Sequence, residues 1–265
     1  DGSWKKRTFR DKYSRAYPIE IVPGKLYLHR KYPVKMTKGI RDSKLNDTKD
    51  YVYSDLSFTL YPRIVENLTG QDFESYLKNN FYKPLGAYSL TFNPLKYYNL
   101  DELVPTEVDT FFRHTLVHGR VHDETAAMMG GVSGHAGLYG NANDVMKVWQ
   151  MYLQKGSFGG HRFLGKETVE EFTRYQYPEI GNRRGIGFDK PTFTYTGNAP
   201  QYASPSSYGH TGFTGIMTWN DPAWGLSYVF LSNRVYPSRS SSALGRFNIR
   251  TGIMDVVYEE LMRKP

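Results

Sequence analysis

The spacing of apolar residues changes along this 265-residue chain, and that change restricts the fold more than any other feature. Within residues 54–70 apolar side chains recur four positions apart, which is the period of an amphipathic helix. From residue 184 to 233 short apolar runs alternate with turn residues, which is typical of strands. Residues 247–264 return to the helical period. Helices, then antiparallel strands, then a closing helix predict a fold of the α+β class.

The first predicted helix covers residues 54–70 and is ended by Gly70. Pro62 is expected to start or kink a turn within it, because proline cannot donate a backbone hydrogen bond. The apolar face consists of Leu56, Leu60, Ile64 and Leu68.

Three further helices and a closing helix are predicted. One begins with Asp72 as its N-cap and ends near Gly86, one is capped by Asn141, and a short one covers residues 165–175. Asp144 is favourably placed in the first turn of the second of these, near the positive end of its dipole. The closing helix is expected to bury Ile249, Ile253, Val257 and Leu261.

Strands are predicted over residues 184–190, 210–220 and 225–233. A turn at residues 221–225 contains Pro and Gly and joins the last two strands. A strand or hairpin is also indicated around Pro23-Gly24, whereas residues 91–124 have weak periodicity and predict mostly loop.

The composition excludes several classes of protein. The chain has 34 Lys and Arg against 26 Asp and Glu, a net charge of +8, but much of the excess falls in the first 50 residues without the motifs of RNA-binding proteins. We therefore expect no nucleic-acid partner. No apolar run reaches the length of a membrane span, and the absence of Cys excludes disulfides and Cys-ligated metals.

The domain organisation follows from the same features. Residues 1–50 are predicted to be a basic, weakly structured arm or partial strands. Residues 51–265 form the domain, with a mainly helical region at 51–180 and the strands and C-terminal helix at 181–265.

Tyr53-Ser54-Asp55 stands where a loop enters the first predicted helix. In one interpretation Ser54 or Asp55 caps that helix and Tyr53 packs beside it. In the other, Tyr53 is a catalytic phenol and Asp55 orients it, because a helix N-terminus and nearby cations favour the charged form of a phenol.

Two other motifs have a structural and a chemical interpretation. His118 and His122 are four apart and are followed by Asp123, so one helical face could hold a metal. Hydrogen-bonded loop histidines, with Asp123 fixing a tautomer, are the favoured interpretation because Gly119 argues against a helix. The glycines at 130–140 match neither phosphate-binding motif, and a tight turn packing into the following helix is expected.

The order of these motifs resembles the class C β-lactamase-like and penicillin-binding-protein-like serine hydrolases. The family has Tyr-x-Asn, here Tyr53-Ser54-Asp55, and Lys-Thr-Gly or His-Thr-Gly on an edge strand, here His210-Thr211-Gly212. The sequence between these two motifs also resembles that of the family, as in "VHDETAAMMGGVSGHAGLYGNANDV". The resemblance covers residues 50–265 and is closest to modules that can follow a family 3 glycoside hydrolase domain. It implies an antiparallel sheet flanked by helices, plus a helical region.

The resemblance also implies roles for individual residues. Tyr53 shares the proton transfer, Asp55 replaces an amide donor by a carboxylate acceptor, and His210 takes the place of the third-motif cation. The backbone N–H of Phe213 supplies half of an oxyanion hole. Thr211, Gly212 and Thr214 line the substrate site, with Gly212 allowing close approach to the strand. No metal or cofactor is implied.

The family's Ser-x-x-Lys nucleophile motif has no convincing counterpart here. The pattern occurs at Ser3–Lys6 and at Ser75–Lys78, and chance alone predicts about one such match. We therefore expect the nucleophile segment to be missing, the domain to be incomplete at its N-terminal side and the sheet to have an exposed edge. That edge could mediate self-association or contact with the missing segment.

The predicted function is the C-terminal part of a β-lactamase-like serine hydrolase, inactive alone, that acts on amides, peptides or esters through an acyl-serine when complete. The alternative is a non-catalytic binding or accessory module of a larger cell-wall or glycan-processing protein. An extracytoplasmic location is implied by the resemblance only.

Overall fold

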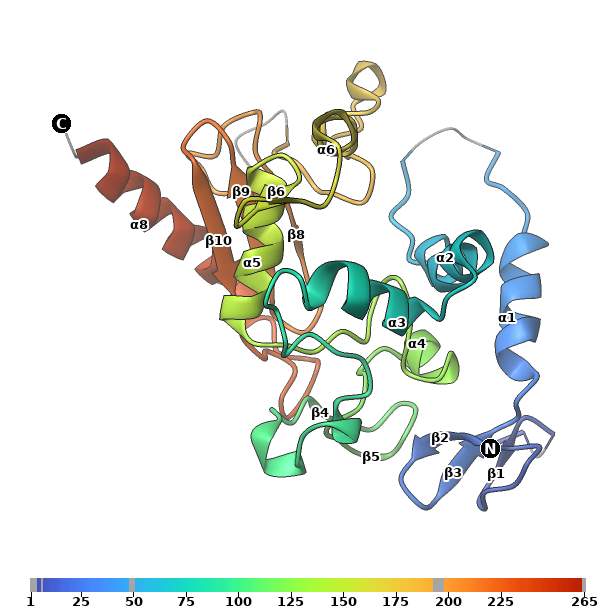
Figure 1. Cartoon of the computed structure of the whole chain (residues 1–265). Helices are drawn as coiled ribbons and strands as arrows, with labels where there is room; N and C mark the ends of the chain where they lie inside the picture. The colour runs from blue at the N-terminus through green and yellow to red at the C-terminus, as the bar shows by residue number, and fades with distance from the viewer. Residues whose placement is uncertain (1–3, 6, 48–50, 193–197, 264–265) are drawn as a thin grey trace. The chain divides into compact units, whose positions relative to one another are not determined.

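The computed structural model describes residues 4–5, 7–47, 51–192 and 198–263 (Figure 1). The chain forms two compact units. Unit 1 comprises the described residues within 1–77, 91–139 and 236–238. Unit 2 comprises those within 78–90, 140–235 and 239–265. Ser3 and Lys6, the first and last residues of one of the two Ser-x-x-Lys matches, lie outside the described residues.

Unit 1 contains five short strands and four helices, with three 3₁₀ turns. The strands are β1 (Phe9–Arg10), β2 (Ile19–Val22), β3 (Leu26–Leu28), β4 (Glu107–Asp109) and β5 (Thr115–Val117). The helices are α1 (Tyr32–Arg41), α2 (Tyr61–Thr69), α3 (Phe73–Leu77) and α4 (Glu124–Met128), and the 3₁₀ turns are η1 (Phe58–Leu60), η3 (Pro94–Lys96) and η4 (Leu100–Glu102).

The strands predicted around Pro23-Gly24 are confirmed. Gly24 has a φ of +66°, and Lys25 donates its N–H to the carbonyl of Val22 at 3.0 Å, which closes the turn between β2 and β3. Strand β1 adds to the other edge of β3, giving the antiparallel order β1-β3-β2.

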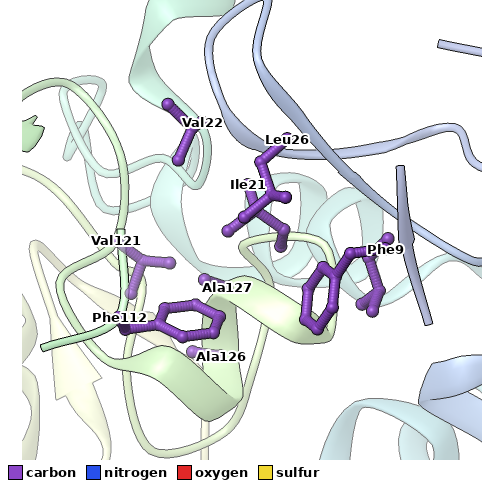
Figure 2. Packing of buried hydrophobic residues seen from close by; sticks show 9 residues of the cluster. Phe9, Ile21, Val22, Leu26, Phe112, Val121, Ala126 and Ala127 are labelled. Carbon is purple, nitrogen blue, oxygen red and sulfur yellow. The ribbon is translucent and has the colours of Figure 1, made fainter. Parts of the chain in front are cut away.

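The N-terminal sheet shares a hydrophobic core with the region around α4. Figure 2 shows Phe9, Ile21 and Leu26 gathered with Phe112 and Ala127 in one cluster. Its full membership is Phe9, Ile21, Val22, Leu26, Leu28, Phe112, Val121, Ala126 and Ala127. Burial of these side chains supplies the main stabilisation of unit 1, because apolar area removed from water is the dominant favourable term in folding.

The helix predicted over residues 54–70 is shorter than expected. Residues 54–57 are not helical, η1 follows, and α2 begins at Tyr61 with Pro62 in its first turn. Proline is tolerated there because its missing N–H would have no partner in any case. Gly70 ends α2 in the left-handed conformation, as predicted.

The helix predicted from Asp72 begins where it was expected, but its α-helical part ends at Leu77. Asp72 accepts the N–H of Ser75 at 2.9 Å and caps α3. Unit 2 then begins with a π-helical turn, η2 (Lys78–Tyr82), in place of a continued α-helix. The loop predicted over residues 91–124 is wrong where β4 and β5 form a hairpin, because each strand has only three residues and too little pattern to reveal it.

Unit 2 contains five strands and four α-helices in its described part. The helices are α5 (Ala142–Leu153), α6 (Lys166–Thr173), α7 (Ala243–Arg246) and α8 (Ile249–Arg263), with a 3₁₀ turn η5 (Pro178–Ile180). The strands are β6 (Ser157–Phe158), β7 (His161–Arg162), β8 (Tyr208–Thr211), β9 (Met217–Asp221) and β10 (Leu226–Phe230).

The three-stranded antiparallel sheet β10-β9-β8 lies between α5 and α8. Side chains alternate across β9, as the pleat requires. Met217 and Trp219 are fully buried against α8, whereas Asn220 faces the other side and donates to the backbone carbonyl of Trp149 on α5 at 2.7 Å. Helices on a small antiparallel sheet give the predicted α+β class (Figure 1).

Two strand predictions in this unit are wrong. Residues 184–190 form no strand and make a single bridge between Asp189 and Gly209, because Gly187 has a φ of +78° that interrupts extended backbone. Residues 210–220 form two strands with a tight turn between them, closed by the N–H of Gly212 donating to the carbonyl of Ile216 at 2.8 Å. The predicted turn at 221–225 is confirmed.

The closing helix is confirmed, but its buried face is not the one predicted. Met254 and Tyr258 are fully buried in contact with the sheet, whereas Ile253 and Val257 remain 43% and 36% exposed. The Tyr258 hydroxyl donates to the Asp221 carboxylate at 2.7 Å, which fixes the rotation of α8. No helix in the described ranges is long and apolar enough to cross a membrane.

Candidate functional site

Tyr53, Ser54 and Asp55 lie in the loop before η1. The Tyr53 hydroxyl donates to the Asp55 carboxylate at 3.0 Å, and the Tyr53 side chain is about half exposed. The Ser54 hydroxyl accepts the N–H of Leu56 at 3.2 Å. Neither η1 nor α2 has a side-chain cap, so the interpretation of Ser54 or Asp55 as a helix cap is wrong. The Tyr53 phenol and the Asp55 carboxylate are paired in this loop, and a catalytic role for them stays a prediction.

His210 lies near the end of β8, and its two ring nitrogens have different partners. Nδ1 is 2.8 Å from the carbonyl oxygen of Thr211, so this nitrogen must donate. Nε2 is 3.0 Å from an Arg184 Nη2, and a guanidinium can only donate, so Nε2 must accept. The imidazole is therefore neutral, with its proton on Nδ1.

The Arg184 guanidinium consequently supplies positive charge beside β8 next to the His210 ring, and the role of His210 in the place of the third-motif cation stays a prediction. The guanidinium of Arg184 is held by the carboxylate of Asp189 at 3.1 Å, and Arg183 binds the same carboxylate at 2.8 Å. Arg184 was not among the predicted site residues. The only signal in the sequence is an Arg pair shortly before an acidic residue, and that pattern is common on protein surfaces.

The turn after β8 contains the remaining predicted residues, Gly212, Phe213 and Thr214. Two arginines from later in the chain hold its carbonyls. Arg234 donates from Nε to the carbonyl of Phe213 at 2.7 Å and from its N–H to that of Thr214 at 2.8 Å. Arg250 donates to the carbonyl of Gly212 at 3.3 Å. Because N–H and C=O point in opposite directions in a trans peptide, holding the Gly212 carbonyl sets the direction of the Phe213 N–H.

A buried lysine supports β8 from the side. Lys190 is 2% exposed, and its Nζ donates to the carbonyl of Ser207 at 2.9 Å and lies 4.6 Å from the ring centre of Tyr175. Burial lowers the pKa of Lys190 to about 8 and raises that of the Tyr208 phenol to about 12. Lys190 and Tyr208 are thus both buried at the start of β8, the strand that carries His210.

His118 and His122 are hydrogen-bonded loop residues, as favoured above. The ring of His118 contacts a backbone carbonyl at 2.7 Å, and His122 contacts the Glu107 carboxylate at 2.6 Å. Asp123 binds the ring of His135 at 2.9 Å, and its role in fixing a tautomer of His118 or His122 stays a prediction. Within the described ranges no three His, Asp or Glu side chains are arranged to hold a metal.

The structure brings the predicted residues together in two groups. Tyr53 and Asp55 form one group in unit 1, and the run from His210 to Thr214 forms the other in unit 2. The first group offers a phenol with a carboxylate acceptor. The second offers a neutral imidazole, a guanidinium and a braced turn at the end of a strand.

This chain is similar to known proteins both in its sequence and in its fold. A family profile described as Beta-lactamase matches residues 31–251. A protein of Escherichia coli strain K12, named "Putative D-alanyl-D-alanine carboxypeptidase", is 34% identical over 94% of this chain. This chain spans 62% of that protein's length.

Two solved structures have a similar fold. A mutant of simvastatin synthase from Aspergillus terreus has a TM-score of 0.59 at 20% identity, over 89% of this chain and 62% of that one. A β-lactamase from Mycobacterium bovis has a TM-score of 0.54 at 19% identity, over 79% and 64%. At these identities the likeness concerns the fold, and it confirms the α+β architecture expected from the resemblance.

Proposed function

Because this chain belongs to the beta-lactamase family, we propose that it is the C-terminal part of a serine hydrolase that cleaves an amide or ester through an acyl-serine. The observation that carries the proposal is the end of β8, where a neutral imidazole and the Arg184 guanidinium stand beside a turn with braced carbonyls. Such a turn holds a backbone N–H in a constant direction, and catalysis at a carbonyl needs a donor that does not reorganise as negative charge develops.

We assign the residues the following roles. Tyr53 accepts the proton of the nucleophile as its own hydroxyl proton passes to the Asp55 carboxylate, which accepts the hydrogen bond from its phenol. The N–H of Phe213 binds the developing oxyanion, and Thr211, Gly212 and Thr214 line the substrate backbone. Arg184 and His210 recognise an anionic group of the substrate. A peptide with a free C-terminal carboxylate fits this charge, and the name of the E. coli relative points to the same class of substrate.

The nucleophile is proposed to lie in a segment outside this chain. Ser75 is exposed on α3, and Lys78 begins the π-helical turn that follows this helix. The other match, Ser3–Lys6, lies outside the described residues at both ends. The curated relatives are longer than this chain, which is compatible with a separate nucleophile segment.

An acylation experiment tests the proposal. This chain alone, incubated with a penicillin and with an activated ester, is expected to show no mass increase, because loss of a nucleophile costs several orders of magnitude in rate. If a segment with the family's Ser-x-x-Lys motif is joined upstream of this chain, a stoichiometric acyl adduct is expected. An adduct on Ser3 or Ser75 would contradict the missing nucleophile, and no adduct with the extended chain would contradict the hydrolase itself.

The proposed role of the Arg184 guanidinium in recognising an anionic group of the substrate leads to a second expected result. Arg184→Gln in the extended protein should lower kcat/KM about 10- to 100-fold for a peptide with a free C-terminal carboxylate, because a charge-assisted hydrogen bond is lost. The same peptide as its C-terminal amide should be affected little. Arg183→Gln is the matched control, since Arg183 binds the same Asp189 carboxylate but does not contact His210. An equal loss of kcat/KM in the two variants, or for the two peptides, would mean that Arg184 is not the cation that recognises the substrate carboxylate.

The alternative is a non-catalytic binding or accessory module of a larger cell-wall or glycan-processing protein. For either function we propose an extracytoplasmic location and a family 3 glycoside hydrolase domain in the same polypeptide. Strand β10 is the outer strand of its sheet, so within the described residues its outer edge has no strand partner. That edge would accept the upstream segment or a second copy.

The division into an arm at 1–50 and a domain at 51–265 is likewise proposed. Saturable binding of a cell-wall glycan by an extended chain that forms no adduct would favour this alternative.

A further inference from the structure

The glycine-rich segment 130–137 of unit 1 packs directly on the segment that follows Tyr53. A Cβ at Gly134 would lie 2.2 Å from the carbonyl oxygen of Phe58 and 3.2 Å from the Cβ of Tyr61. Only glycine permits this approach, because a real side chain is not found so close to a backbone oxygen. The contact places the next residues of the loop beside η1.

His135, directly after Gly134, uses both ring nitrogens. Nε2 lies 2.9 Å from the carboxylate of Asp123. Nδ1 lies 2.9 Å from the hydroxyl of Ser133 and 3.3 Å from that of Thr59. Since the carboxylate can only accept, Nε2 donates, and a neutral ring then accepts at Nδ1. The side chain of His135 is 4% exposed, so these contacts exclude competing water.

Ser133, His135 and Asp123 have the order of hydrogen bonds found in a Ser-His-Asp triad, but a substrate cannot reach them. Ser133 is 3% exposed, and the Asp123 oxygen that binds His135 also accepts the N–H of Ala126 as the cap of α4. A nucleophile needs an open approach for the carbonyl that it attacks. The arrangement is therefore an anchor within the fold.

The anchor reaches the candidate site through Thr59. Its hydroxyl carries one hydrogen, which is shared between His135 Nδ1 at 3.3 Å and the backbone carbonyl of Asp55 at 3.2 Å, and its N–H donates to the same carbonyl at 3.1 Å. Asp55 in turn accepts from the Tyr53 phenol. We propose that His135 is a positioning residue that, through Thr59, holds the Asp55 turn so that the Tyr53 hydroxyl keeps one orientation. The inference rests on the proposed function in that Tyr53 is the reacting phenol.

The test observes Tyr53 itself, in this chain, by ¹⁹F NMR after labelling with 3-fluorotyrosine. The chain has 22 tyrosines, and the Tyr53 resonance is identified by its loss in Tyr53→Phe. Thr59→Val keeps the volume and removes the hydroxyl, whereas Thr59→Ser keeps the hydroxyl. Ser133→Ala removes the other hydroxyl at Nδ1 and is the matched control for burial.

Thr59→Val is expected to shift or broaden the Tyr53 resonance by more than its line width, whereas Thr59→Ser and Ser133→Ala leave it in place. His135→Phe should cause a similar change, and combining it with Thr59→Val should add little, because both act through one contact. An unchanged Tyr53 resonance in Thr59→Val, or equal changes in Thr59→Val and Ser133→Ala, would overturn the inference. The readout needs no turnover, so an inactive extended protein would refute the hydrolase and leave this result unaffected.

Discussion

Replacing Asp109 by Ala is expected to destabilise unit 1 by about 3–5 kcal/mol, the cost of leaving one member of a buried ion pair without its partner. Asp109 ends β4 and is fully buried. Its carboxylate accepts the backbone N–H groups of Phe111 and Phe112 at 2.8 Å, and both the N–H and the guanidinium of Arg113 at 3.0 and 3.2 Å. All of these donors would lose their acceptor together.

The second half of the pair explains why the loss should be large. Arg113 is 5% exposed, and its guanidinium also donates to the backbone carbonyls of Val121 and His122 at 2.8 and 3.0 Å. Val121 belongs to the core cluster of Figure 2. Without Asp109 the buried guanidinium would lose its directly bonded carboxylate and keep hydrogen bonds to backbone carbonyls, with Glu124 and Asp123 as the remaining nearby negative charges.

Urea unfolding followed by far-UV circular dichroism measures the effect. Asp42→Ala is the control, because Asp42 forms a solvent-exposed pair with Arg41 and such pairs contribute little to stability. If Asp109→Ala costs no more than the control, the buried pair does not support unit 1 as described.

The pH dependence gives an independent check on Asp109. Burial raises the pKa of its carboxyl, but the backbone N–H groups and Arg113 outweigh it and hold the pKa below the usual value. A lowered carboxyl pKa contributes stability that is present above the unfolded pKa of about 4 and is lost as the pH falls through the folded pKa. Asp109→Asn should therefore flatten the fall in stability below about pH 4. An equally steep fall in that variant would assign it to other carboxyls.

Gly209→Ala is expected to destabilise unit 2 by about 3 kcal/mol, at the upper end of the cost of overpacking. Gly209 lies in β8, and a Cβ there would lie 2.2 Å both from the carbonyl oxygen of Thr218 and from the indole of Trp219. Trp219 is fully buried between the sheet and α8, so it cannot turn away. The variant must distort the strand that carries His210 or displace the largest side chain of the core.

Gly252→Ala on α8 is the matched control. A Cβ at Gly252 meets nothing within 4 Å, and Ala favours a helix over Gly by about 0.5–1 kcal/mol, so this variant should be slightly more stable. Opposite signs for the two substitutions are therefore expected in the same urea titration. A neutral Gly209→Ala would mean that β8 and Trp219 can separate without cost.

Part of the architecture could be predicted because the responsible interactions are local. Asn141 caps α5 by accepting the N–H of Asp144 at 2.9 Å, and Gly70 ends α2 with a positive φ. Both depend on residues a few positions apart, which the sequence displays directly. The Tyr53–Asp55 pair is of the same kind, since the two residues are two apart and their side chains meet in one turn.

The rotation of α8 could not be predicted, because it depends on a partner far away in the sequence. The series Ile249, Ile253 and Val257 is the more apolar one, but the buried series is Met254 and Tyr258. The hydroxyl of Tyr258 has an acceptor only because β9 places a buried carboxylate beneath it. Periodicity reveals a helix and leaves open which of two apolar stripes meets the sheet.

The sequence by itself determined the fold class, the positions of the main helices and the residues that carry the family resemblance. Tertiary structure alone decided that His210 is neutral beside Arg184, and that His135 contacts Thr59. The physical reason is the same for both. Each ring nitrogen takes its donor or acceptor role from a group that is distant along the chain, and only the folded backbone brings those groups within hydrogen-bond distance.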